Sequence, residues 1–124
     1  MTTNTLETIH GVRVLRGALE GPSLDGEQAA LDLIGDAMGH DAQLVALPVE
    51  RVADEFFRLR SGIAGAVMQK FVNYHVRLAV VGDISRFVAD STALRDFVHE
   101  TNQGAHIWFL TDDDALDARL RPAG

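Results

Sequence analysis

Three short and almost uninterrupted apolar runs constrain the fold of this chain more than any other feature. They are QLVALPV at 43–49, RLAVVG at 77–82 and HIWFL at 106–110. Runs of this length without polar alternation are typical of strands that are covered on both faces, as in a parallel sheet between helices. We therefore expect these three segments to be strands of one largely parallel sheet.

Segments with helical periodicity separate and follow these runs. Their apolar residues recur at intervals of three and four, and they cover residues 27–38, 61–75, 91–104 and 112–120. Gly39 is the expected C-cap of the first helix, Ser61 the expected start of the second, and Thr111 the expected cap of the last. Before them, LETIH (6–10) and VRVLR (12–16) alternate apolar and polar residues, which predicts a hairpin.

The predicted order of elements is β-β-α-β-α-β-α-β-α. Strand–helix alternation implies right-handed crossovers and a largely parallel sheet, to which the opening hairpin adds one antiparallel neighbour. The sequence thus predicts an α/β fold with a single mixed, mostly parallel five-stranded sheet. Its 124 residues suit one domain, with ends at 1–5 and 121–124 that we expect to fray.

Composition argues against several classes of function. The net charge of -7 disfavours nucleic acid or an anionic membrane as a main partner, and no segment has the roughly 18 to 20 apolar residues of a membrane span. The chain has no cysteine and no visible signal peptide, so we expect a cytoplasmic protein. The histidines lack metal-ligand spacing and no nucleotide-binding motif is present, so we expect neither a metal nor a cofactor.

The segment FFRLRSGIAG at 56–65 carries the main functional signal. Arg58 and Arg60 stand just before the predicted helix start, and Gly62 leaves backbone amides uncovered there. Such a helix start suits a phosphate or a carboxylate. Two structural alternatives remain open at this point. Ser61 and the glycines could serve only capping and close packing, or the arginines could pair with nearby acids, namely Asp54, Glu55 or Asp83.

Two further pairs of polar residues are candidates for the same function. Asp83 and Ser85 follow the strand at 77–82, so they should share the carboxyl edge of the sheet with the Ser61 loop. Asp83 would orient an arginine or bind a ligand, or it would merely cap its own turn. Lys70 and Asn73 lie on the polar face of the second helix, which is either a solvated face or a partner-binding face.

The patterns FFRLRSGIAG, QKFVNY and RLAVVGDIS, followed by SxALRDFV, resemble an uncharacterised bacterial family that is known only as a domain of unknown function. More loosely, the element order and the glycine-opened second helix resemble the STAS domain of anti-sigma factor antagonists. That resemblance implies a cytoplasmic regulator that binds a partner kinase and is switched by phosphorylation of a serine. Here Arg60 takes the position of that serine and Leu59 that of the preceding aspartate, so we expect no phosphoswitch.

The leading hypothesis is a small cytoplasmic STAS-like binding or regulatory module that acts through a protein partner or a small anionic ligand. We lean against an enzyme. The alternative is an enzyme or ligand carrier that uses Arg58 and Arg60 to hold an anion and Asp83 as acid or base. A homodimer through an exposed strand or the second helix is a third hypothesis. The candidate binding residues are Arg58, Arg60, Ser61, Gly62, Lys70, Asn73, Asp83 and Ser85.

Overall fold

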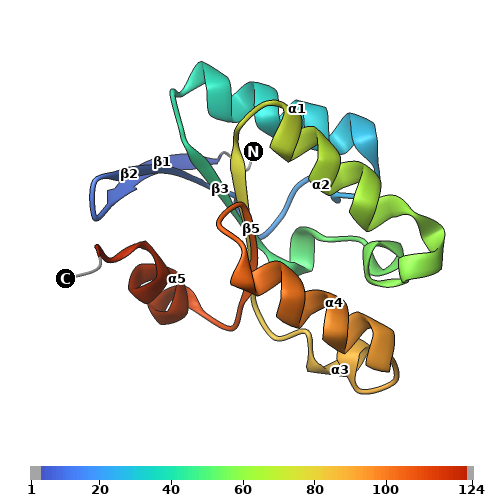
Figure 1. The fold of residues 1–124 in the computed structure, drawn as a ribbon. Helices are drawn as coiled ribbons and strands as arrows, with labels where there is room; N and C mark the ends of the chain where they lie inside the picture. Colours follow the sequence, from blue (N-terminus) through green and yellow to red (C-terminus); the bar gives the residue numbers. More distant parts are fainter. Residues whose placement is uncertain (1–3, 123–124) are drawn as a thin grey trace.

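A five-stranded sheet forms the centre of the protein (Figure 1), whose computed structural model describes residues 4–122. The strands lie in their chain order, and they are β1 (Thr5–Ile9), β2 (Val12–Arg16), β3 (Leu44–Pro48), β4 (Arg77–Val81) and β5 (Ile107–Leu110). β1 pairs with β2 in antiparallel fashion, and all later neighbours are parallel. The structure therefore confirms the predicted mixed, mostly parallel sheet.

The hairpin between β1 and β2 closes through a two-residue turn. His10 and Gly11 both have positive φ angles, 49° and 81°, and Ile9 pairs with Val12 across the turn. Two consecutive positive φ values characterise the turn type whose twist matches that of paired strands. The first strand already includes Thr5, so the fraying that we expected does not reach this residue; residues 1–3 and 123–124 lie outside the described part of the chain.

Helices cover both faces of the sheet, but one face carries more of them than the other. The longer ones are α1 (Glu27–Gly39), α2 (Ile63–Asn73), α4 (Thr92–Gln103) and α5 (Asp113–Leu120). From β2 to β5 each crossover adds its strand on the same side of the previous one. Because such crossovers are right-handed, their helices all lie on the same face of the sheet. Accordingly α1, α2 and α4 share a face, while α5 lies on the other (Figure 1).

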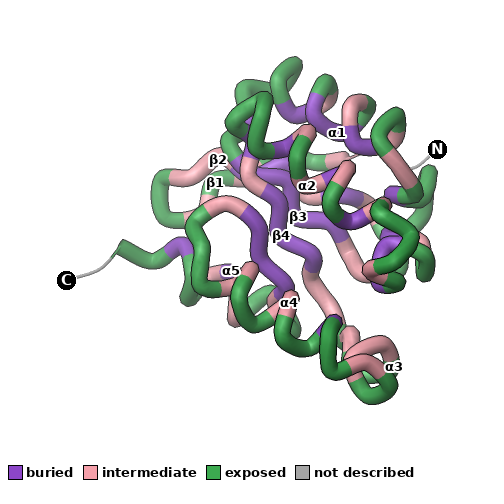
Figure 2. The backbone as a smooth tube through the Cα atoms, turned by 45° about the vertical axis from the view of Figure 1, so that its right-hand side comes forward, coloured by how far each residue is buried: buried purple, intermediate pink, exposed green. Residues whose placement is uncertain are grey.

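Each central strand alternates its side chains between two apolar layers. In β3, Val45 and Leu47 face the helices α1, α2 and α4, whereas Leu44 and Ala46 belong to the smaller layer that α5 covers. All four are at most 1% exposed. Figure 2 shows the central strands β3 and β4 largely in the purple of buried residues, between the helices. Burial on both faces is the physical reason that these strands read as continuous apolar runs.

The loops contain short helices that the periodicity did not predict. They are the 3-10 turns η1 (Val49–Arg51), η2 (Asp54–Phe57) and η3 (Leu59–Ser61), and the four-residue helix α3 (Ser85–Val88). Stretches this short carry less than two turns of pattern, so hydrophobic periodicity cannot reveal them.

Three predicted helix caps were wrong. Helix α2 begins at Ile63, not at Ser61, because Gly62 has a left-handed conformation (φ 78°) that separates η3 from the helix. Asp112 instead of Thr111 caps α5, since its side chain accepts a hydrogen bond from the Ala115 amide at 2.8 Å. Gly39 is the last residue of α1, and His40 is its C-cap.

Membrane-spanning segments are not found in the described range. None of the helices within residues 4–122 combines the length and the apolar character that crossing a bilayer requires.

Candidate functional site

A groove lined by three arginines lies where the loop after β3 meets the segment after β4. It has a volume of about 670 Å³, and Arg58 and Arg60 line one side while Arg86 and Phe87 line the other. Ser91, at the start of α4, also lines it. We call this hollow the arginine groove. It contains both arginines that the sequence predicted as site residues, Arg58 and Arg60.

Two buried phenylalanines fix the position of the arginines. Phe56 and Phe57 are 1% and 4% exposed, and their rings meet edge-on with centroids 5.3 Å apart. Phe57 also stacks on Phe87 of α3, with centroids 4.2 Å apart and planes inclined by 17°. Phe56 and Phe57 anchor the chain in the core directly before Arg58. The segment that follows them therefore holds Arg58 and Arg60 at a fixed place on the surface.

Arg58 and Arg60 are exposed, and neither guanidinium forms an ion pair within residues 4–122. The arginine ion pairs of the described chain involve other residues, namely Arg13, Arg16, Arg86 and Arg121. The structure therefore does not show the expected alternative in which Arg58 and Arg60 pair with Asp54, Glu55 or Asp83. Two unneutralised guanidinium groups remain available at the groove.

Arg86 is the third arginine of the groove, and the sequence analysis missed it. Its Nη2 lies 3.1 Å from Asp54 Oδ1 in an exposed ion pair, and its guanidinium lies over the Phe87 ring, 4.0 Å from the centroid. In the sequence, Arg86 and Phe87 are adjacent, as Phe57 and Arg58 are. This repeated aromatic–arginine pair was the one sequence signal that could have identified Arg86 as a site residue. Its placement opposite Arg58 depends on the tertiary structure.

The start of α4 adds a favourable field for an anion. Ser91 caps this twelve-residue helix by accepting a hydrogen bond from the Leu94 amide at 3.1 Å, and both Ser91 and Ala93 line the groove. The N-terminal end of a helix carries a partial positive charge. Among residues 4–122, Asp90 is the single carboxylate that lines the groove, so positive charge prevails there.

Ser61 and Gly62 shape the loop next to the groove instead of lining it. The Ser61 hydroxyl lies 2.8 Å from the Glu55 carbonyl and 2.7 Å from the Arg58 carbonyl, to either of which it can donate, and it accepts from the Ile63 amide at 3.2 Å. These bonds tie η2, η3 and the start of α2 together. Gly62 supplies the left-handed turn between η3 and α2.

Asp83 and Ser85 form a local turn. Asp83 Oδ1 accepts a hydrogen bond from the Ser85 amide at 2.8 Å, and hydrogen bonds from the Ser85 backbone and side chain lower the pKa of the Asp83 carboxyl. No hydrogen bond or ion pair joins Asp83 to Arg58 or Arg60 in the described chain. A carboxyl with a lowered pKa is poorly matched to acid–base chemistry near neutral pH.

Lys70 and Asn73 lie in the last turns of α2, away from the groove. Asn73 accepts a hydrogen bond from the Gln69 side chain at 2.8 Å, and neither Lys70 nor Asn73 lines the groove. The structure therefore separates this pair of predicted site residues from the arginines.

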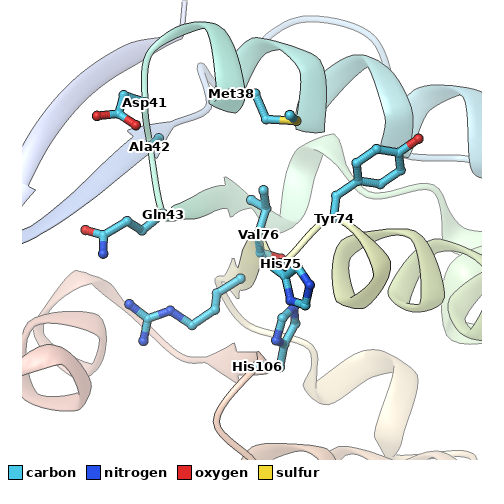
Figure 3. Close-up of a pocket in the computed structure, with 9 residues that line it drawn as sticks. Met38, Asp41, Ala42, Gln43, Tyr74, His75, Val76 and His106 are labelled. Carbon is cyan, nitrogen blue, oxygen red and sulfur yellow. The ribbon is translucent and has the colours of Figure 1, made fainter.

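A second hollow, of about 630 Å³, lies at the amino ends of the strands (Figure 3). Met38 and Tyr74, which are 58% and 49% exposed, line it together with His75 and His106. His106 Nε2 lies 3.0 Å from the Val76 carbonyl and 3.1 Å from that of Phe71, so this ring is tied to the backbone. Within residues 4–122, no three His, Asp or Glu side chains gather as metal ligands would.

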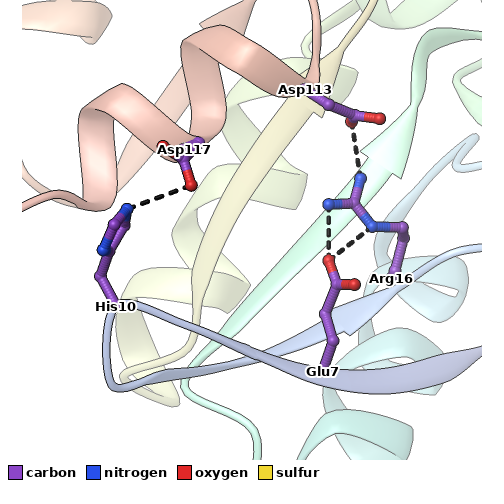
Figure 4. A network of polar contacts seen from close by, with 5 residues as sticks. All are labelled: Glu7, His10, Arg16, Asp113 and Asp117. Carbon is purple, nitrogen blue, oxygen red and sulfur yellow. Dashed lines mark hydrogen bonds and ion pairs between the residues drawn. The ribbon is translucent and has the colours of Figure 1, made fainter.

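A polar network joins α5 to the hairpin on the other face of the sheet (Figure 4). Arg16 contacts Glu7 Oε1 at 2.6 Å and Asp113 Oδ1 at 2.7 Å, and His10 Nε2 lies 3.1 Å from Asp117 Oδ1. Burial lowers the pKa of Arg16, but its hydrogen bonds and charge interactions with Glu7 and Asp113 outweigh this and raise it. The network anchors α5, and it pairs both Arg16 and His10 with carboxylates.

Comparison with known families supports the sequence resemblance to a domain of unknown function. A family model described as "Domain of unknown function (DUF4180)" matches residues 9–120. The chain belongs to the DUF4180 family. The DUF4180 match includes every residue of the arginine groove but only the last residue of β1. No curated protein and no solved structure matches the chain, so the STAS-like resemblance stays a prediction.

Proposed function

We propose that this DUF4180 protein is a binding module that takes up an anionic group in the arginine groove. The anionic group belongs to a small ligand or to a protein partner, and no phosphoswitch is involved. The main supporting observation is the pair of exposed guanidinium groups of Arg58 and Arg60, which have no acidic partner within residues 4–122. The chain has 18 acidic residues against 11 lysines and arginines, so unpaired arginines beside a third in one groove point to an external anion.

The chemistry of the groove fits this function. A guanidinium group offers planar, paired donors to carboxylate or phosphate oxygens, and these charge-assisted hydrogen bonds are stronger than neutral ones. The stacked rings of Phe57 and Phe87 hold the two sides of the groove together. Donors held in place by packed neighbours lose less conformational entropy when a ligand binds.

We also propose a cytoplasmic location for this module. The chain lacks cysteine, and its acidic net charge disfavours nucleic acid and anionic membranes as partners. The turn bond and lowered pKa of Asp83 offer no support for the enzyme alternative, so binding without catalysis is the function we favour.

The test removes the two free guanidinium groups together. Titration calorimetry with pyrophosphate and with citrate should show binding to the wild type, and Arg58→Ala/Arg60→Ala should weaken it by more than about tenfold, or roughly 1.4 kcal/mol. The loss should shrink at high salt, because exposed charges are screened. Urea unfolding should show a change in stability within about 0.5 kcal/mol, as for most surface substitutions.

A charge-matched control separates the groove from net charge. Arg95→Ala/Arg121→Ala also removes two exposed arginines, but both lie outside the groove, so this variant should bind like the wild type. Equal losses in both double variants would show that binding follows net charge and would contradict the proposal. The proposal would also be contradicted if the wild-type protein bound neither small anions nor acidic peptides.

A further inference from the structure

We infer that the ligand of the arginine groove is a short acidic segment of a protein partner, in which an apolar side chain stands between carboxylates. This inference rests on the proposed function and narrows it from anions in general to one class of partner. Three observations support this inference. They are the size of the groove, the arrangement of its apolar and charged residues, and the net charge of the whole molecule.

The size of the groove suits a segment of chain. Its volume of about 670 Å³ lies within the range of about 300 to 1,000 Å³ that is typical of sites for drug-sized ligands. A single phosphate or carboxylate would contact only one end of such a space. A peptide of several residues can reach both Arg58 and Arg60 on one side and Arg86 on the other.

The charged groups form a rim around an apolar floor. Arg58, Arg60 and Arg86 are exposed, whereas Phe57 is 4% exposed and Leu59 and Phe87 are half-buried. Across residues 4–122, no buried side-chain nitrogen or oxygen lacks a hydrogen-bond partner, so the groove holds no buried donor that waits for a small anion. An apolar centre with a polar rim is the usual anatomy of a protein interface.

The order of residues at the start of η3 suggests the order of charged and apolar residues in the partner. Leu59 lies between Arg58 and Arg60, and all three line the groove. A complementary segment places an apolar side chain against Leu59 and Phe87, with a carboxylate before it and another after it. Arg86 contributes by exchanging its exposed ion pair with Asp54 for a carboxylate of the partner.

The charge of the whole molecule favours this orientation. With a net charge of -7, the molecule as a whole repels an acidic segment, whereas the groove, as far as residues 4–122 line it, combines three arginines with one carboxylate, that of Asp90. Complementary charge steers association and suppresses wrong docking geometries. An acidic partner is therefore directed to this groove.

The experiment selects a displayed library of random eight-residue peptides on the wild-type protein. We expect enrichment, by more than about tenfold, of sequences in which Leu, Ile or Phe is flanked by Asp or Glu. A synthetic peptide of the enriched sequence should lose affinity by a similar factor when its apolar residue is replaced by serine. Selection on Arg58→Ala/Arg60→Ala should not enrich this pattern.

A second variant tests the groove without removing an arginine. Ala93 lines the groove in the first turn of α4 and is exposed, so Ala93→Glu places a carboxylate there at a position where acidic residues stabilise a helix. Ala93→Gln has nearly the same size without the charge. We expect Ala93→Glu to abolish peptide binding and Ala93→Gln to retain more of it.

The outcomes distinguish this inference from the proposed function. If pyrophosphate or citrate binds in an Arg58- and Arg60-dependent way but the library shows no acidic–apolar pattern, the proposed function stands and the inference is overturned. If the serine-substituted peptide binds as well as its parent, the apolar anchor is wrong and the inference is overturned too. If neither peptides nor small anions bind, both fail.

Discussion

At the scale of single residues, Gly82 and Gly35 occupy opposite environments. Gly82, directly after β4, has a φ angle of 145°, and a Cβ atom there would overlap the Val49 side chain, with Val49 Cβ only 2.9 Å away. Gly35 lies on the exposed side of α1 with open space around it. The same substitution should therefore have opposite effects at the two positions.

We expect Gly82→Ala to lower the free energy of unfolding by more than about 1 kcal/mol, because both the backbone conformation and the contact with Val49 oppose a side chain. Gly35→Ala should raise it by up to about 1 kcal/mol, since alanine favours the helical conformation. Urea unfolding of both variants measures these changes. If Gly82→Ala raised the free energy of unfolding, the Val49 side chain would be able to move away from the new Cβ atom without loss of stability, which would contradict this prediction.

At the scale of elements, a side chain of α4 covers part of one edge of the sheet. β5 is an edge strand, and the side chain of Asn102 on α4 bonds both backbone groups of one of its residues, Phe109. Asn102 Oδ1 accepts from the Phe109 amide at 2.6 Å, and Nδ2 donates to the Phe109 carbonyl at 3.0 Å. At Phe109 the carboxamide thus takes the place of a neighbouring strand, which hinders pairing of this edge with another chain.

Replacing Asn102 by Leu should remove both hydrogen bonds and leave the Phe109 backbone groups without partners. We expect a loss of about 2 kcal/mol in the free energy of unfolding, with increased association at high protein concentration. The control Gln103→Leu, next to it on α4, removes only an exposed bond to His99 and should change stability by less than about 0.5 kcal/mol. Equal effects of the two substitutions in urea unfolding would contradict the role of Asn102.

At the scale of the whole molecule, α5 connects the last part of the chain to the first. Leu116 and Leu120 cover the smaller apolar layer, while Asp113 and Asp117 reach Arg16 and His10 of the hairpin. Hydrogen bonds from Arg121 and His10 lower the pKa of the Asp117 carboxyl. Because the lowered pKa belongs to the folded state, Asp117 adds stability above its unfolded pKa, and this contribution is lost as the pH falls through the folded pKa.

Acid unfolding tests this connection. We expect the stability of the wild type to fall from about pH 5 to pH 3, around the unfolded pKa of about 3.9, and Asp117→Asn to show a smaller fall because it has no proton to gain there. Asp114→Asn removes a carboxylate from the same helix but no hydrogen bond, so it shows how much of the change follows from net charge. An unchanged pH dependence in Asp117→Asn would contradict the role of this carboxylate.

Much of the fold follows from local pattern. The apolar runs at 43–49, 77–82 and 106–110 correspond to β3, β4 and β5, because strands buried on both faces need apolar residues at every position. Three helix caps were predicted at the wrong residue and the short helices were not predicted, since one residue in a left-handed conformation, such as Gly62, is enough to move a helix start. Arg51 shows the same limit, because the periodic pattern did not mark it as buried, yet it is 5% exposed and donates to the carbonyls of Ala18 and Pro22.

The sequence by itself determined that Arg58 and Arg60 flank an apolar residue next to a glycine-opened helix, because these are relations between neighbours in the chain. Only the tertiary structure decided what surrounds them. The stacking of Phe57 on Phe87 brings Arg86 to the same groove, while the turn at Asp83 and the direction of α2 leave Asp83, Lys70 and Asn73 outside it. Contacts between distant segments depend on how helices pack on the sheet, and hydrophobic periodicity along one segment carries no information about that packing.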